Sequence, residues 1–122
     1  MTESSTIVQA PPRGTYRLRL TPDEVRRLGK YLSVIVARVR AATTGDERDR
    51  HPIEKLTIDL AGAPTAPGSQ LVMLVRLLRR TLGNGVHIEL SGVGPMIRTS
   101  LTAFGIPRDV TVTDLRGRSW IS

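Results

Sequence analysis

Residues 56–74 constrain the fold of this chain more than any other stretch. They read LTIDLAGAPTAPGSQLVML: five residues in which apolar and polar side chains alternate, a loop rich in alanine, glycine and proline, and then a strongly apolar segment. Alternation over a few residues predicts a β-strand with one buried face, whereas apolar residues at helical spacing predict a helix. The stretch therefore predicts a strand, a loop at residues 61–67 and a helix at residues 69–82, with Ser69 as its N-cap.

The same alternation recurs in three other short segments. Residues 16–20, 86–90 and 110–113 each alternate apolar side chains with charged or hydroxyl-bearing ones, which predicts three further strands. Two more segments, residues 22–42 and 96–104, have apolar side chains at helical spacing. The chain therefore alternates between strands and helices along its whole central part.

Details of the two additional helices follow from their sequences. Thr21, Pro22 and Glu24 form the pattern of a capping box with proline at the first helical position. From there the apolar periodicity runs without a break, so we expect one rod about 30 Å long. In the helix at residues 96–104, the spacing places Phe104 on the buried side together with Ile97 and Leu101.

This order of elements predicts an α/β fold with a mainly parallel sheet and right-handed crossovers. We expect four strands, or five if the N-terminal tail adds a companion to the strand at Tyr16. Parallel strands covered on both faces are almost continuously apolar, yet every strand here is polar at alternate positions. The helices should therefore pack mainly on one face. The other face is then solvated, covered by a terminal segment or paired with another subunit.

At 122 residues, the chain is long enough for a single hydrophobic core. We expect one domain at residues 15–114, a flexible N-terminal tail at residues 1–14 and a C-terminal tail at residues 115–122, where the lone Trp120 more readily covers apolar surface than binds a ligand. No apolar run reaches the roughly 20 residues that span a bilayer, and the N-terminus lacks the pattern of a signal peptide. The sequence therefore predicts a cytoplasmic protein without membrane insertion.

Metal, cofactor and catalytic chemistry find little support in the composition. The chain has no cysteine, which excludes disulfides, iron–sulfur clusters and thiolate–zinc sites. Its two histidines are His51, in a charged loop, and His87, which shares a strand face with Glu89. No nucleophile or anion hole accompanies that pair. We therefore expect no metal, no cofactor and no catalytic residues, and an enzyme is the least favoured class.

The chain carries a formal net charge of +7, which raises the question of nucleic acid as a partner. The cations are dispersed along the sequence, and aromatic side chains that could stack on bases make up only 3% of it. A solvated basic surface is the favoured interpretation, and nucleic-acid binding remains a second hypothesis. Its candidate residues are Arg26, Arg27, Arg38, Arg40, Arg76, Arg79 and Arg80.

From residue 56 to residue 113 the chain resembles a STAS domain, the fold of bacterial anti-sigma-factor antagonists. Residues 58–62 (IDLAG) resemble the strand before the family's phosphorylation loop, and residues 71–82 resemble the helix after it. Residues 85–93 resemble the next strand and turn, and residues 101–106 (LTAFGI) match a Leu-x-x-x-Gly-Ile pattern. The resemblance implies a regulatory protein that binds a protein partner.

The loop differs from the family's pattern at the motif that is phosphorylated. Phosphorylatable members carry Asp-Ser-Ser-Gly, and the first serine is the acceptor; the matching positions here are Pro67, Gly68, Ser69 and Gln70. The acceptor position thus lacks a hydroxyl, and Ser69 is the one nearby candidate for a displaced acceptor. The N-terminal half also departs, because the family usually begins with paired strands.

These observations lead to one functional hypothesis and two alternatives. We expect a non-enzymatic protein-binding module without a phosphorylation switch, whose partner is an anti-sigma factor or a serine kinase. The first alternative is a STAS subunit of a larger signalling or transport assembly, and the second is the nucleic-acid-binding protein considered above. Homo-oligomerisation is a separate expectation. The predicted partner-binding residues are Pro64, Thr65, Pro67, Gly68, Ser69, Gln70 and Met73.

Overall fold

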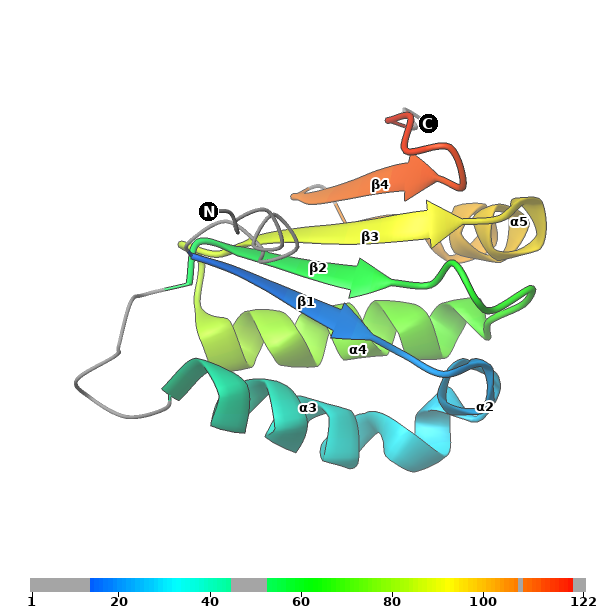
Figure 1. Ribbon diagram of the computed structural model, residues 1–122. Helices are drawn as coiled ribbons and strands as arrows, with labels where there is room; N and C mark the ends of the chain where they lie inside the picture. Colours follow the sequence, from blue (N-terminus) through cyan, green and yellow to red (C-terminus); the bar gives the residue numbers. More distant parts are fainter. Residues whose placement is uncertain (1–13, 45–52, 108, 120–122) are drawn as a thin grey trace, which may run out of the picture.

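The computed structural model describes residues 14–44, 53–107 and 109–119 (Figure 1). Most of the predicted N-terminal tail, the loop that contains His51, and Trp120 lie outside these residues. The elements confirm the predicted alternation of strands and helices. In chain order they are β1 (Thr15–Arg19), α2 (Pro22–Arg26), α3 (Leu28–Thr44), β2 (Lys55–Asp59), α4 (Gly68–Leu82), β3 (His87–Val93), α5 (Pro95–Phe104) and β4 (Val110–Asp114).

The described strands form one parallel sheet in the order β1-β2-β3-β4. Because each crossover leads to the next strand in the same direction, right-handed connections place every connecting helix on the same side. Figure 1 shows this arrangement, with the helices beneath the sheet and its upper face without them. The predicted fold class and one-sided packing are therefore confirmed. Such an order has no point of reversal, where open α/β sheets usually form a ligand crevice.

The core lies between the sheet and the helix layer. Apolar positions of the strands face the helices and are buried, as the alternation predicted. Removing such side chains from water provides most of the favourable free energy of folding. The largest fully buried side chains are Leu18, Leu28, Ile35, Leu56, Ile58, Leu60, Leu71, Leu74, Leu78, Ile88, Leu90 and Ile97.

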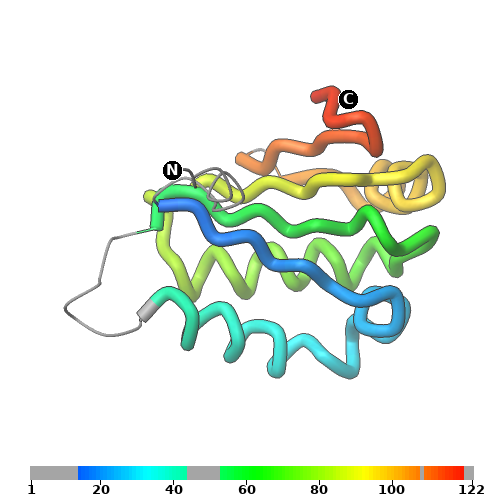
Figure 2. Tube along the Cα trace, in the orientation of Figure 1, coloured from blue at the N-terminus to red at the C-terminus, as the bar shows by residue number. Residues whose placement is uncertain are grey.

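The predicted single rod at residues 22–42 is wrong, because the helix breaks at Arg27. Its start is as predicted: the Thr21 hydroxyl accepts the N–H of Glu24 (3.1 Å), and the Glu24 carboxylate accepts the N–H of Thr21 (2.9 Å). After one turn the trace changes direction, as Figure 2 shows, and α3 begins. The N–H of Gly29 donates to the side chain of Gln70 on α4 (2.9 Å). That bond takes the donor a continuous helix would direct to residue 25.

Strand β3 is longer than predicted and reaches Val93. It contains an irregularity between Leu90 and Val93, where its register with β4 shifts. Gly92 lies within this segment with φ +70, and a Cβ there would come within 2.7 Å of the Ala61 Cβ. Glycine therefore permits both the positive φ and the close approach of β3 to the start of the 61–67 loop.

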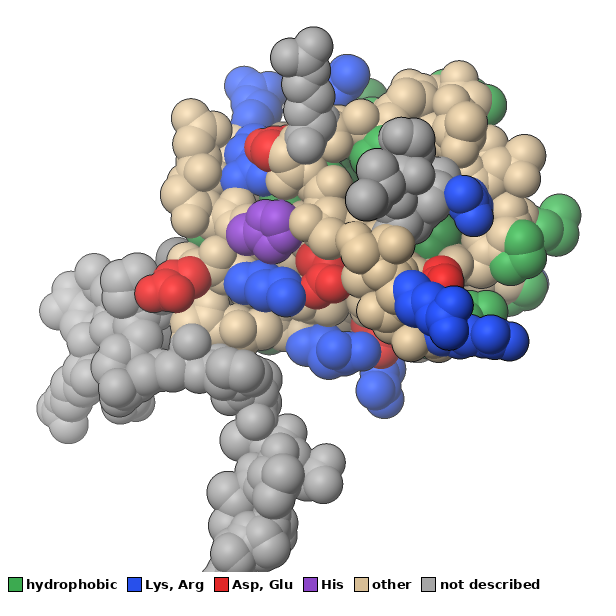
Figure 3. Space-filling view, turned by 90° about the horizontal axis from the view of Figure 1, so that it is seen from above, with side chains coloured by type: hydrophobic (Ala, Val, Ile, Leu, Met, Phe, Trp, Pro, Cys, Tyr) green, Lys and Arg blue, Asp and Glu red, His purple; other side chains and the backbone are tan. Residues whose placement is uncertain are grey.

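The sheet face opposite the helices is a surface of paired polar side chains. Figure 3 views this face from above and shows charged groups gathered over the strands. Thr57 and Asp59 point to this face as predicted, yet both are buried, because their neighbours cover them. The pairs are Arg17 with Asp59 (3.1 Å), Arg19 with Asp59 (3.5 Å), Lys55 with Glu89 (3.0 Å), Thr57 with Glu89 (3.3 Å) and His87 with Thr111 (2.8 Å).

The chain turns back after β4. Thr113 and Ser119 form an isolated antiparallel bridge, and the N–H of Asp114 donates to the carbonyl of Arg118 (2.9 Å). The described part of the predicted C-terminal tail is thus attached to the edge of the sheet. None of the described helices has the length and apolar character needed to cross a membrane.

Candidate functional site

The predicted partner-binding residues lie in the 61–67 loop and in the first turns of α4, where the chain leaves the carboxyl end of β2. They differ in exposure. Pro64, Thr65, Ser69 and Met73 are exposed, Pro67 and Gln70 are partly buried, and Gly68 is buried. The structure therefore separates residues that a partner can contact from residues that hold the site in place.

Gly68 lies where α4 meets α5. Its N–H donates to the hydroxyl of Ser100 (2.9 Å), so a serine of α5 satisfies one of the free donors at the start of α4. A Cβ at residue 68 would lie 2.5 Å from the Ser100 Oγ, 2.6 Å from the Ser100 carbonyl oxygen and 2.9 Å from Phe104. Residue 68, which the sequence resemblance predicts to match the family's phosphoserine, is thus a packing position without room for a larger side chain.

The prediction that Ser69 is the N-cap of α4 is wrong. The N-cap is Pro67, which has no side-chain acceptor, and the helix begins at Gly68. Ser69 therefore lies inside the first turn, with its side chain exposed. Ser100 supplies the capping hydroxyl from a distant part of the sequence, which no local pattern around residue 69 reveals.

Gln70 attaches the start of α4 to α3. Its side-chain oxygen accepts the N–H of Gly29, and a Cβ at residue 29 would come within 2.7 Å of the Gln70 amide nitrogen. Together with the Gly68 contact to Ser100, this bond holds the beginning of α4 between α3 and α5. These two contacts therefore fix the end of the loop, and the exposed residues of the loop point away from it.

The start of the loop is fixed by Asp59, whose side chain is only 8% exposed. Its carboxylate accepts the N–H of Ala61 (2.9 Å) and pairs with Arg17 and Arg19. Burial by itself raises the pKa of this carboxyl, but the Ala61 N–H and the two guanidinium groups outweigh burial and hold the pKa below its usual range. Asp59 therefore stays ionised at neutral pH. A shallow depression beside it is lined by Arg19, Leu20, Thr21, Pro22, Asp59, Ala61 and Gly62.

Two large apolar side chains stand exposed near the start of α4. Met73 is 47% exposed, and Phe104, at the end of α5, is 58% exposed. The prediction that Phe104 is buried is therefore wrong. Its ring lies against Gly68 where α4 and α5 meet, whereas Ile97 and Leu101 are the buried residues of α5. The periodic spacing of residues 97, 101 and 104 contains no signal that separates the third residue from the other two.

The outward face of α4 continues from Met73 as a cationic stripe. Ser69, Met73, Arg76 and Arg80 are all exposed and are spaced four, three and four residues apart, which places them on one side of a helix. We use the name α4–α5 surface for these four residues together with Phe104, Pro64 and Thr65. It combines an apolar part at the start of α4 with arginines toward its end.

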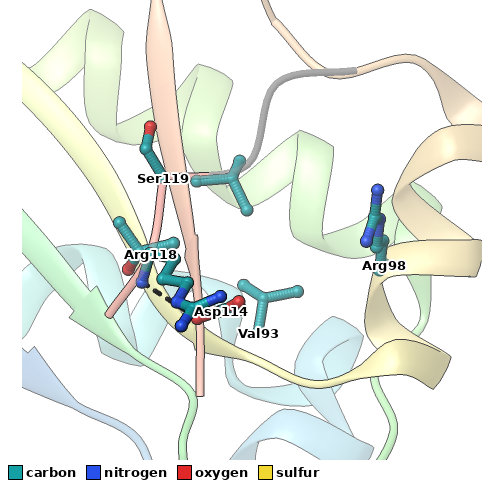
Figure 4. A pocket seen from close by; sticks show the side chains of 7 residues that line it. Val93, Arg98, Asp114, Arg118 and Ser119 are labelled. Atoms are coloured by element: carbon teal, nitrogen blue, oxygen red, sulfur yellow. Dashed lines mark hydrogen bonds between the residues drawn. The ribbon is translucent and has the colours of Figure 1, made fainter. Parts of the chain in front are cut away.

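A separate hollow lies at the ends of β3 and β4 (Figure 4). Its volume is about 320 Å³, and it is lined by Val93, Arg98, Val112, Thr113, Asp114, Arg118 and Ser119. The carboxylate of Asp114 accepts the N–H groups of Arg118 and Arg116 (2.9 Å each). The bond from Arg118 contributes most to holding the pKa of Asp114 below its usual value. No local sequence pattern predicts this hollow, because it forms only when the 115–119 turn folds back on β4.

No group of three or more histidine and carboxylate side chains in the described part of the chain is placed to hold a metal ion. His87 directs its Nε2 to the Thr111 hydroxyl, so that ring is part of the paired polar face. The α4–α5 surface and the hollow at the ends of β3 and β4 are both suited to binding through apolar contact and charge.

The chain matches no protein-family model, no curated protein and no solved structure. The STAS resemblance therefore stays a prediction from the sequence, and inferences about function depend on the exposed side chains, contacts and charges of the described residues.

Proposed function

We propose that the chain is a non-enzymatic, cytoplasmic regulatory module that binds a protein partner through the α4–α5 surface. The observation that carries this proposal is the exposure of two large apolar side chains, Met73 on α4 and Phe104 at the end of α5, where Phe104 lies against Gly68. Exposed large apolar side chains with polar residues around them are typical of interaction sites on soluble proteins. A fixed support lowers the entropic cost of binding, because little needs to be ordered when the partner arrives.

The chemistry of the surface indicates what the partner should present. Aromatic residues, methionine and arginine are enriched at protein interfaces, and this surface contains all three kinds. Arg76 and Arg80 favour a partner whose rim carries carboxylates, because complementary charge speeds association and selects the partner. An anti-sigma factor or a serine kinase, which the STAS resemblance implies, is the proposed class. A larger signalling or transport assembly that contains such a partner would use the same surface.

We expect no phosphorylation switch at residue 68, because glycine has no hydroxyl. The exposed Ser69 allows a direct test with the captured kinase and ATP, followed by mass spectrometry of the residue 69 peptide. An unmodified peptide agrees with the proposal. Stoichiometric phosphate on Ser69 would show that the switch has moved by one residue and is retained.

The binding surface is tested with a double variant, Met73→Ser with Phe104→Ser. The partner is first captured from the source cell with the intact chain, identified by mass spectrometry and then titrated calorimetrically. Truncating two central apolar side chains should weaken binding by roughly tenfold or more. Met96→Ser is the matched control: Met96 is 63% exposed at the opposite end of α5, and its replacement should leave the affinity unchanged.

Two results would contradict the proposal. One is a partner bound equally well by the double variant while both proteins remain folded. The other is capture of nucleic acid alone with an affinity that falls steeply as salt increases, which would favour the nucleic-acid alternative. Self-association is checked by light scattering, where a monomer at high concentration would exclude the proposed homo-oligomer.

A further inference from the structure

We infer that the hollow between β4, the 115–119 turn and α5 binds a small organic anion, and that Arg98 and Arg118 hold its carboxylate or phosphate group. This β4–α5 hollow is independent of the α4–α5 surface. It lies at the carboxyl ends of two neighbouring parallel strands, β3 and β4. Its volume of about 320 Å³ falls at the small end of ligand pockets.

Cationic groups border the hollow from two sides. Figure 4 shows Arg98, on α5, across the hollow from Arg118 and Asp114. Guanidinium groups bind carboxylates and phosphates through paired hydrogen bonds, which makes arginine well suited to recognising these anions. The first turn of α5 adds to the positive potential, because the helix dipole directs its positive end there and that turn contains no acidic side chain of its own.

Asp114 is the one acid in the lining, and it does not cancel this potential. One of its oxygens accepts the N–H groups of Arg116 and Arg118 from within the turn. Its carboxylate thereby shapes the turn that carries the Arg118 side chain. The three charged side chains of the lining sum to one positive charge.

The remaining residues of the lining indicate the chemistry of the rest of the ligand. Val93 and Val112 are buried apolar residues, which favours a short aliphatic part. Thr113 also lines the hollow, and its hydroxyl can donate a hydrogen bond to an anionic oxygen. Ser119 offers a second hydroxyl at the rim. The ligand class is thus a carboxylate or phosphate on a small, partly apolar body.

The test is a heteronuclear NMR titration of the full chain with two probes, inorganic phosphate and butyrate, at constant ionic strength. Saturable shifts of amides in residues 93–98 and 112–119 support the inference. Saturation by phosphate alone shows that the charged group suffices, whereas saturation by butyrate alone shows that the aliphatic part is needed. Shifts that grow linearly with both probes, or that spread over the whole surface, would overturn it.

Three variants separate a built site from general attraction to a basic protein. Arg98→Ala and Arg118→Ala should each weaken binding of the saturating probe by roughly tenfold or more. Arg118→Ala keeps the backbone N–H that binds Asp114, so the turn should persist, which amide exchange can check. Arg116→Ala is the matched control, because Arg116 lies in the same turn but does not line the hollow. Equal weakening by Arg116→Ala would refute the assignment.

Discussion

Replacing Gly68 by alanine is the most direct test of how the start of α4 is built. The backbone of Gly68 is helical, so alanine meets no conformational strain and gains up to about 0.5–1 kcal/mol from its better helix propensity. The added Cβ, however, would lie 2.5 Å from the Ser100 hydroxyl and 2.6 Å from the Ser100 carbonyl oxygen. The hydroxyl can rotate away, whereas the carbonyl belongs to the backbone of α5, and that helix has to move.

The magnitude follows from these two opposing terms. Forcing an extra carbon into a well-packed contact costs about 1–3 kcal/mol. Subtracting a propensity gain of about 0.5–1 kcal/mol leaves a destabilisation of roughly 0–2.5 kcal/mol, which corresponds to a melting temperature lower by roughly 4 °C for each kcal/mol. Gly68→Ser should cost at least as much, because its hydroxyl enlarges the same clash.

The assay is urea unfolding followed by circular dichroism, with Gly85→Ala as the matched control. Gly85 has no atom within 4 Å of its would-be Cβ and no positive φ, so alanine there should be neutral or stabilising by up to about 1 kcal/mol. Adding Ser100→Ala to Gly68→Ala should recover only part of the loss, because the carbonyl contact remains. If Gly68→Ala were as stable as Gly85→Ala, the account of the helix crossing would be refuted.

Three further predictions concern the contacts around this site. The lowered pKa of Asp59 means that its contribution to stability is complete above the unfolded-state value of about 3.9 and is lost as the pH falls through the folded-state value. Asp59→Asn should therefore lower stability at neutral pH by roughly 1.5–3 kcal/mol and flatten the acid limb of the stability profile. Gln70→Ala should cost about 1 kcal/mol and speed hydrogen exchange at the amide of Gly29, which loses its acceptor. Thr21→Ala should cost about 0.5–2 kcal/mol in thermal unfolding, because it removes the capping hydroxyl.

Each of these predictions has a result that contradicts it. An Asp59→Asn variant with an unchanged acid limb would show that other carboxylates dominate the pH dependence. Unaltered exchange at Gly29 in Gln70→Ala would mean that the break between α2 and α3 does not depend on the Gln70 contact. For Thr21, a variant as stable as the wild type would show that Glu24 alone suffices at the helix start.

Local patterns accounted for the order of the elements and for the beginning of α2. Alternation marked the strands because a side-chain period of two matches a sheet with one buried face. The polar positions on every strand also predicted the one-sided helix layer, since strands covered on both faces would have been apolar throughout. These features depend on neighbours along the chain, and sequence alone contains that information.

The three errors share a different cause. At the break before α3 the Gln70 side chain accepts the N–H of Gly29, and at the start of α4 the Ser100 hydroxyl accepts the N–H of Gly68. The exposure of Phe104 follows from the same helix crossing. Each contact joins residues more than thirty positions apart, so no window of local sequence contains both partners.

What the sequence determined by itself, then, is an α/β chain with one polar sheet face, whereas the resemblance of its loop to a phosphorylation loop stays a prediction. Only the tertiary structure showed that Gly68 is the contact point of two helices, with no room for a side chain. The same folding exposed Phe104 beside it and closed the hollow between Arg98 and Arg118. Both sites are formed by segments that are distant in the sequence and come together only when the chain folds.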